Sequence, residues 1–202
     1  MGSRDEILAS VRRNLPRVDR PLPHVPLFDD HTEWSLLSKF KDSLERMGGV
    51  FLDPQAGGDP LLAVREKIAD AKIICSVTPE IPGNRDIATV TAPRDLADVD
   101  FAIVRASFAV AETGSVLLSD ADLHVNALAY LAQNLIVLLD PADIVVNLHH
   151  AYQRPAFRDR HYAAFHTGPS ATADIEGVLI HGAQGVRSLS VLPLARRDNG
   201  SK

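Results

Sequence analysis

The sequence predicts an α/β fold with a mostly parallel sheet flanked by helices and preceded by an N-terminal helical arm. Three observations point to it. Helical and extended hydrophobic patterns alternate from residue 33 onward, as in layered α/β domains. The extended segments are short apolar runs, which suit buried parallel strands. A chain of 202 residues with 46% hydrophobic side chains can also bury one complete core.

The first fifteen residues predict a helix, because Ile7, Leu8, Val11 and Leu15 fall on one face. Pro16 ends the pattern, and further prolines predict a stiff, extended connector over 16–32. The helix is either an arm that docks on the body or on a second copy in a homo-oligomer, or a peripheral helix of its own domain. The α/β domain is then expected over 33–202.

Within that domain each element follows from its local pattern. A helix over 33–47 ends at Gly48, and the next elements are a strand over 50–53, a helix over 60–71 and a strand over 72–77. The later strands are expected over 86–90, 101–106, 108–112, 115–119, 135–140, 161–167 and 189–194. Helices are expected over 141–153 and 171–182, and residues 122–133 are either a helix or an insertion.

Composition narrows the class of function. The net charge is −5, without a block of like charges, which argues against a nucleic-acid or anionic-membrane surface. The longest run of Leu, Ile and Val, 135–139, is far shorter than the roughly 20 residues that span a bilayer. The N-terminus is charged and lacks the apolar centre of a signal peptide, so the expected location is the cytoplasm.

Cysteine and histidine usage limits the cofactors. Cys75 is the single cysteine, so this chain alone can form no disulfide, iron–sulfur cluster or cysteine zinc site. Its strand setting favours a buried hydrophobic role. Adjacent His149 and His150 point in different directions on a helix, and no H-x-x-x-H spacing occurs, so no metal site is predicted.

The stretch GPSATADIE, residues 168–176, is the first candidate site. Gly168 permits close approach to the backbone, and Ser170 or Thr172 is a suitable N-cap for the helix expected after it. A helix N-terminus attracts a phosphate or carboxylate, and Asp174 would flank the apolar face as an orienting or catalytic acid. The alternative is an ordinary helix cap, because Ser, Thr and Asp are preferred there in any case.

The second candidate site is Glu112-Thr113-Gly114, between two apolar strand segments. Gly114 in such a setting indicates a bulge or a close backbone approach. Glu112 is expected to be half-buried and could serve as acid, base or nucleophile. The alternative is a hairpin turn with polar residues facing solvent. Since ligands of parallel sheets bind at the carboxyl ends of the strands, both candidate sites are expected to meet at one rim.

Read together, AETGSVLL and the later GPSATADIEGVLIHGAQGVRSLSVLPL resemble the LUD (lactate-utilisation) domain, specifically its LutC/YkgG type. The likeness spans nearly the whole chain. It implies a fold like the NagB/RpiA/CoA-transferase group and a bacterial cytoplasmic role in oxidising L-lactate to pyruvate, beside separate iron–sulfur subunits. It also implies substrate binding by residues of both motifs: Thr113, Gly114, Gly168, Ser170, Thr172, Gln184 and Gly185, with Glu112 and Asp174 as candidate catalytic acids.

The chain departs from the family pattern at two places. Gln184 stands where the family has His, and Val186 stands where it has Pro. An Arg-containing segment after the Glu-Thr-Gly strand is not recognisable, which removes a strong anchor for a carboxylate or phosphate. Three functions therefore stay open: a component of a lactate-oxidising system, a stand-alone enzyme for a phosphorylated, CoA-linked or carboxylate molecule, and a degenerate binding module.

Overall fold

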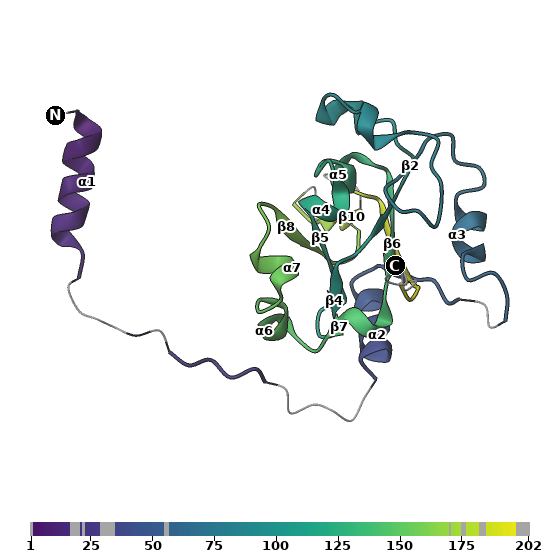
Figure 1. Cartoon of the computed structure of the whole chain (residues 1–202), viewed down its shortest axis with the longest axis horizontal. Helices are drawn as coiled ribbons and strands as arrows, with labels where there is room; N and C mark the ends of the chain where they lie inside the picture. The colour runs from purple at the N-terminus through teal and green to yellow at the C-terminus, as the bar shows by residue number, and fades with distance from the viewer. Residues whose placement is uncertain are drawn as a thin grey trace, which may run out of the picture.

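The computed structural model describes residues 2–16, 21, 23–28, 35–54, 57–169, 171–174, 177–181 and 185–196. Two sheets pack face to face and helices cover their outer sides (Figure 1). The larger sheet is entirely parallel, with the strand order β1-β11-β6-β3-β2. This confirms the predicted α/β class with a mostly parallel central sheet.

The parallel sheet consists of β1 (Val50–Phe51), β2 (Ile74–Ser76), β3 (Phe101–Arg105), β6 (Asn134–Leu139) and β11 (Ser188–Pro193). Its middle strands are apolar on both sides, because each side meets a separate core. In β6, Leu135, Val137 and Leu139 join the main core between the sheets. Ile136 and Leu138 face the other way and pack with Val64 of α3 (Leu62–Lys67). Burial on both sides explains the continuous apolar runs in the sequence.

The second sheet has the order β7-β4-β5-β8 and is mainly antiparallel. Its strands are β4 (Phe108–Val110), β5 (Ser115–Ser119), β7 (Ile144–Val145) and β8 (Ala163–His166). Its outer face packs with α6 (Leu148–Ala151) and α7 (Pro155–Arg158), around Phe108, Leu117 and Phe165. The short helices α4 (Asp120–Leu123) and α5 (Leu128–Leu131) occupy the segment predicted as helix or insertion.

Two local predictions in this region are wrong. Residues 86–90 form the 3-10 helix η1 (Ile87–Thr89) instead of a strand, because the Asp86 carboxylate accepts a hydrogen bond from the backbone N–H of Ala88. The helix predicted over 141–153 is divided. The 3-10 helix η3 (Pro141–Asp143) comes first, β7 pairs with β4, and only α6 is helical after the Asn147 N-cap. A further 3-10 helix, η2 (Pro93–Leu96), precedes β3.

Helix α2 (Leu36–Arg46) closes one end of the core with Phe40 and Leu44, both fully buried as its apolar period predicts. Gly48 ends it with a φ of +82°, a conformation that suits glycine. The prediction starts this helix at 33, but residues 33 and 34 lie outside the described residues. Helix α2 packs against both β1 and β7, so it touches the two sheets together.

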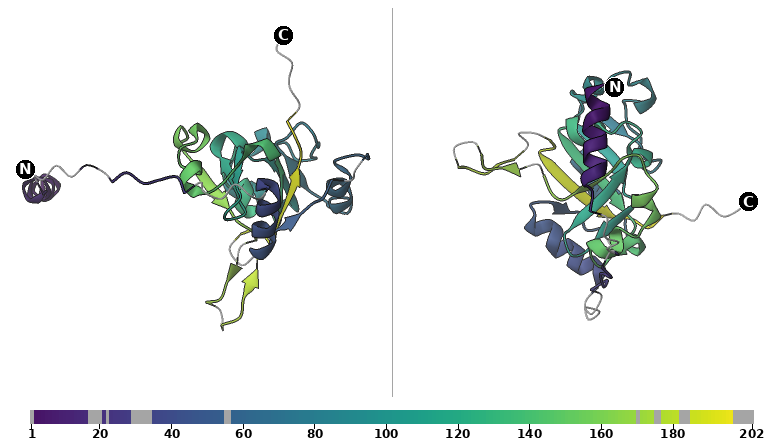
Figure 2. Two further views of the ribbon diagram at one scale, coloured as in Figure 1. Left: turned by 90° about the horizontal axis from the view of Figure 1, so that it is seen from below. Right: turned by 90° about the vertical axis from the view of Figure 1, so that its left-hand side faces the viewer.

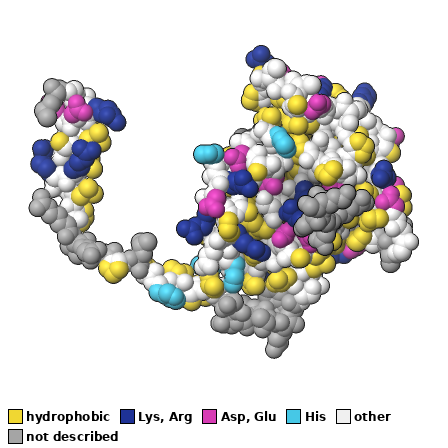
Figure 3. Space-filling model, viewed as in Figure 1, with side chains coloured by type: hydrophobic (Ala, Val, Ile, Leu, Met, Phe, Trp, Pro, Cys, Tyr) yellow, Lys and Arg dark blue, Asp and Glu magenta, His cyan; other side chains and the backbone are white. Residues whose placement is uncertain are grey.

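Helix α1 (Ser3–Asn14) stands apart from the body and buries none of its residues (Figure 1). Hydrophobic side chains run along it beside Arg side chains (Figure 3). Ile7, Val11 and Leu15 are all more than half exposed. The connector reaches the body at Leu27 and Phe28, whose carbonyls accept hydrogen bonds from the Asn147 amide at 2.7 Å and 3.0 Å.

Candidate functional site

The Glu112-Thr113-Gly114 segment is the turn of the β4–β5 hairpin, not a bulge within a strand. Gly114 has a φ of +69° and donates its N–H to the carbonyl of Val110. A Cβ atom at Gly114 would lie 2.3 Å from the backbone nitrogen of Leu44. The close backbone approach expected at this glycine is therefore present, and the partner is α2.

Glu112 is exposed, so the expectation of a half-buried carboxylate is wrong. The apolar strands flank it in sequence, but its place in the turn carries its side chain out of the core. Its Oε2 accepts a hydrogen bond from the backbone N–H of Leu148 at 3.3 Å, at the start of α6. Its carbonyl accepts one from the Ser43 hydroxyl of α2 at 3.1 Å. The carboxylate thus lies where α2, α6 and the hairpin turn meet.

A row of three hydroxyl groups links this turn to the end of β8. Thr113 Oγ1 and Ser115 Oγ are 2.7 Å apart, and Ser115 Oγ lies 2.5 Å from Thr167 Oγ1. Ser115 is buried, so the row is screened from bulk water at its centre. Each hydroxyl can both donate and accept, and the row can therefore present either a donor or an acceptor to a bound group.

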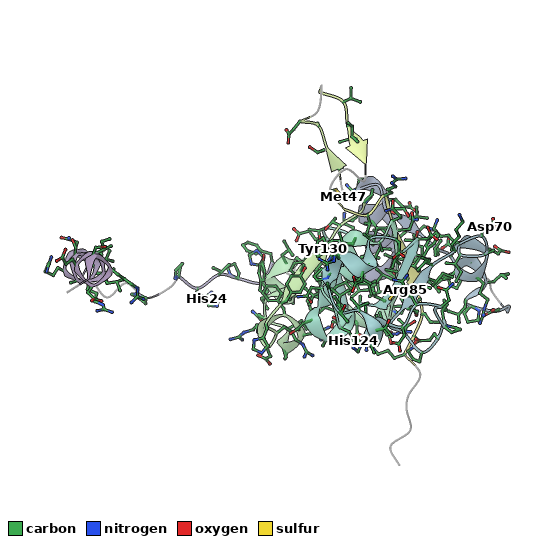
Figure 4. The ribbon with its side chains drawn as sticks, turned by 90° about the horizontal axis from the view of Figure 1, so that it is seen from above. His24, Met47, Asp70, Arg85, His124 and Tyr130 are labelled. Carbon is green, nitrogen blue, oxygen red and sulfur yellow. The ribbon has the colours of Figure 1, made fainter. Side chains whose placement is uncertain are left out.

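Gly168 follows this row and packs on the end of α2. Its φ is +75°, and a Cβ atom there would lie 2.2 Å from the carbonyl oxygen of Met47. A Cβ atom built on Gly48 would lie 3.4 Å from Cδ of Pro169. Figure 4 shows Met47 at the base of the hairpin that comes next in the chain. Gly114 and Gly168 are far apart in sequence, yet both lie against the C-terminal half of α2.

The helix predicted over 171–182 is wrong. The described residues form an antiparallel hairpin of β9 (Ala171–Thr172) and β10 (Ile180–His181), which projects from the body (Figure 2). Gly177 has a φ of +69°, which suits a turn between strands. No helix N-terminus is therefore available among the described residues of this stretch to attract an anion. Ser170, Ile175, Glu176, Gly182 and Gln184 lie outside the described residues.

Asp174 belongs to this hairpin and is exposed. Its Oδ2 accepts a hydrogen bond from the Thr172 hydroxyl at 3.2 Å, and its own N–H donates to that hydroxyl at 3.3 Å. Such a local turn is the usual role of Thr and Asp outside regular structure. The structure does not bring Asp174 into a described cavity with Glu112, so only part of the expected convergence is found.

A cavity of about 620 Å³ lies at the junction of α2, the β4–β5 turn, α6 and β8. Sequence reasoning identified only Glu112 and Thr113 among its residues. The helical spacing of the polar positions 39, 43 and 46 places them on one face of α2, and this is the sequence pattern that could have identified the α2 side of the cavity. The remaining described residues that line it are Lys39, Ser43, Arg46, Met47, Ser115, Leu148, Tyr152, Phe165 and Thr167.

The charges in this cavity are unevenly placed. Lys39 and Arg46 come from α2, and Arg46 Nη2 is 3.5 Å from the buried hydroxyl of Ser43. Glu112 is the single acidic side chain among the described lining residues. The guanidinium of Arg46 favours an anionic ligand, and the hydroxyl row can hydrogen-bond to it.

A smaller cavity of about 230 Å³ adjoins the first and shares Phe165 and Thr167 with it. Gly168 and Gly185 line it, together with Tyr130 and His166. Burial lowers the pKa of His166 to about 4, and its Nε2 is buried without a hydrogen-bond partner among the described residues. Tyr130 and Tyr162 share a hydrogen bond through their hydroxyls, and burial is the main reason that the pKa of Tyr162 is raised.

The predicted substrate-binding residues are therefore divided. Thr113 lines the larger cavity, Gly168 and Gly185 line the smaller one, and Thr172 lies in the hairpin. In the described part of the chain, no three His, Cys, Asp or Glu side chains are grouped to hold a metal ion. Within the same residues, no helix has the length and apolar character needed to cross a membrane.

Comparison with known proteins gives two findings. The model of the LUD domain matches residues 66–192. A crystal structure of a DUF162 family protein from Deinococcus radiodurans is similar over 77% of this chain and 94% of its own, with 19% identity and a TM-score of 0.56. At that identity the likeness supports the fold alone. Among curated proteins, none matches the chain.

Proposed function

The chain belongs to the LUD domain family, and on that premise we propose that it is a LutC-like component of a cytoplasmic system that oxidises L-lactate to pyruvate. The match to the family model over residues 66–192 is the observation that carries the proposal. The two motifs behind the resemblance to the LutC type, around Glu112 and Gly168, both pack against α2. The larger cavity lies beside them.

Oxidation of lactate to pyruvate releases two electrons and two protons, which an acceptor must take. This chain is poorly suited to hold an iron–sulfur cluster, because Cys75 is its single cysteine and is fully buried in β2. We therefore assign the clusters, and the acceptance of electrons, to separate iron–sulfur subunits. The role of this chain is to bind and orient a small anionic ligand at the interface with them.

Within the larger cavity, Lys39 and Arg46 would attract the anion, and the row of Thr113, Ser115 and Thr167 would hydrogen-bond to it. Glu112 would accept or return a proton, since its carboxylate lines the same cavity. Its hydrogen bond from Leu148 N–H holds the carboxylate at the start of α6.

The proposal is tested by co-purification and growth. The tagged chain, expressed with candidate iron–sulfur subunits from the same genome, should co-elute with them, and deletion of its gene should impair growth on L-lactate but not on pyruvate. Absence of co-elution together with unchanged growth on lactate would exclude the proposed role.

A second candidate is a stand-alone enzyme or binding module for a phosphorylated, CoA-linked or carboxylate molecule. The cavity favours it, because cations, hydroxyls and a carboxylate lie together within this single chain. Thermal shift of the isolated chain against sugar phosphates, CoA esters and carboxylates separates the two. A stabilising ligand together with normal growth of the deletion strain on lactate would favour this second function.

A further inference from the structure

The larger cavity has two chemically different sides. Lys39, Ser43 and Arg46 of α2 bring charge and hydroxyl groups. The opposite side consists of apolar and aromatic side chains from α6 and β8, which are Leu148, Tyr152 and Phe165, and Met47 extends it at the end of α2. A ligand that bound through charge alone would leave this apolar side in contact with water.

The apolar side is supported from behind by an aromatic cluster. The Tyr152 and Phe165 rings pack edge to face with centroids 6.3 Å apart. Phe157 of α7 stacks on Phe165 at 5.6 Å and meets Tyr152 at 5.1 Å. Phe165 also contacts Phe108 of the second sheet at 6.1 Å. Because these contacts position the rings before any ligand arrives, little ordering is needed on binding.

Size points the same way. A volume of about 620 Å³ falls within the range of about 300–1,000 Å³ typical of sites for cofactor-sized or drug-sized ligands. A small acid such as lactate, held by Lys39 or Arg46, would occupy only the end of the cavity near α2. The aromatic side would stay unfilled.

We propose, resting on the proposed role of this cavity as an anion site, that its ligand is an amphipathic anion. The carboxylate head lies between the α2 cations and the hydroxyl row. An apolar body covers Leu148, Tyr152 and Phe165. The substrate class is therefore a hydroxy acid that carries an alkyl or aromatic extension beyond the length of lactate.

A chain-length series tests this on the full-length protein. Binding of lactate, 2-hydroxybutyrate, 2-hydroxyhexanoate and 2-hydroxyoctanoate is measured by calorimetry at constant ionic strength. Each added methylene that leaves water should tighten binding about fourfold, from about 0.8 kcal/mol per buried CH₂. Equal affinity across the series, or a loss of affinity as the chain lengthens, would overturn the proposal.

Two pairs of variants separate the head from the tail. Tyr152→Ser should weaken the binding of 2-hydroxyoctanoate about tenfold, as expected for a lost aromatic contact. It should leave the binding of lactate unchanged. Tyr130→Ser is the comparison variant, since Tyr130 is similarly exposed but lines the smaller cavity instead of the larger one, so it reports whether the tail enters the smaller cavity. Arg46→Gln should weaken the binding of every acid in the series by one common factor. Arg158 is exposed, and Arg158→Gln should leave the binding of all of them unchanged.

Failure here is distinguishable from failure of the proposed function. Equal affinity for all four acids, together with normal co-elution and lactate-dependent growth, would exclude only the amphipathic ligand and leave the proposed function in place. A steep series, with weaker binding of the long acid by the Tyr152 variant but not by the Tyr130 variant, supports the cavity assignment even if deletion leaves growth on lactate intact. Equal effects of the Tyr152 and Tyr130 variants on the long acid would overturn the assignment of its tail to this cavity.

Discussion

Ser115 Oγ and Thr167 Oγ1 lie 2.5 Å apart and tie the β4–β5 turn to the end of β8. Their strands pair antiparallel, with Val116 opposite His166. The hydroxyl row therefore rests on sheet hydrogen bonds on both sides, while α2 packs over it through Gly114 and Gly168. The site depends on how closely this helix approaches the sheet.

Gly114→Ala should destabilise the fold strongly. The new Cβ would lie 2.3 Å from the backbone of Leu44, and the φ of +69° disfavours any L side chain. Overpacking and left-handed strain together predict a loss of about 3 kcal/mol or more in the free energy of unfolding. Urea denaturation measures this loss.

Gly57→Ala is the control, because the φ of Gly57 is also positive but no atom lies within 4 Å of a Cβ built there. It should lose only about 1–2 kcal/mol. Equal losses would contradict the close packing.

Stability should fall as the pH drops from about 6.5 to about 4, in part through His166. Burial holds the folded pKa near 4, against 6.5 for an unperturbed histidine. In that window the unfolded chain binds a proton at this site and the folded chain does not, so unfolding is favoured. The expected loss is about 3 kcal/mol over the window. It is read from the difference in pH slope between wild type and His166→Phe. The exposed His161→Gln variant should keep the wild-type slope.

Glu112→Gln should separate catalysis from binding. If Glu112 moves a proton, the change should lower turnover of the reconstituted system about 10²–10⁴-fold. The substitution should not weaken the binding of an anion, because it removes a negative charge from the cavity. Asp174→Asn is the matched change and should leave both quantities unaltered, since Asp174 is exposed on the projecting hairpin. Loss of turnover in Asp174→Asn alone would show that the hairpin, and not the cavity, holds the acid.

Deletion of residues 1–15 should leave the stability of the body unchanged. Helix α1 buries none of its side chains, so its loss should change the free energy of unfolding by no more than about 0.5 kcal/mol. Chemical denaturation measures this, and light scattering on the same samples gives the mass. A larger loss, at unchanged mass, would mean that the helix packs on its own domain. A fall in mass would mean that it joins two copies.

Local patterns predicted the elements that form the main core. The strands β3 and β6 contain continuous apolar runs because both of their sides are buried, and Phe40 and Leu44 in α2 show a helical period because that face of the helix is buried. The pattern over 171–182 predicts a helix because Ile175, Val178 and Leu179 would share one helical face, yet Val178 and Leu179 are both about 60% exposed in the hairpin. The apolar side chains in this hairpin are not buried. A periodic apolar pattern predicts a helix reliably only where the apolar side chains pack into a core.

The candidate site was only partly predictable, because pairing between distant segments is not contained in local patterns. Gly114 was recognised as a point of close approach, but nothing near it in sequence identifies α2 as the neighbour. Lys39 and Arg46 resemble ordinary exposed helix residues until α2 is placed over the hairpin turn. The apolar strands that flank Glu112 predict a half-buried carboxylate, yet Glu112 itself lies in a turn and is exposed.

The anchoring of the connector by Asn147 has a consequence for encounters with other proteins. Because Leu27 and Phe28 are held at the body, the tether of α1 begins there and not at α2. The chain from Leu15 to Leu27 can span at most about 40 Å. The Leu15 end of the apolar stripe of α1 is thus kept within that radius of α6, and a surface that captures the stripe is held near the body at an effective concentration that can reach the millimolar range. A longer tether would lower this effective concentration, and so weaken binding, without altering any contact.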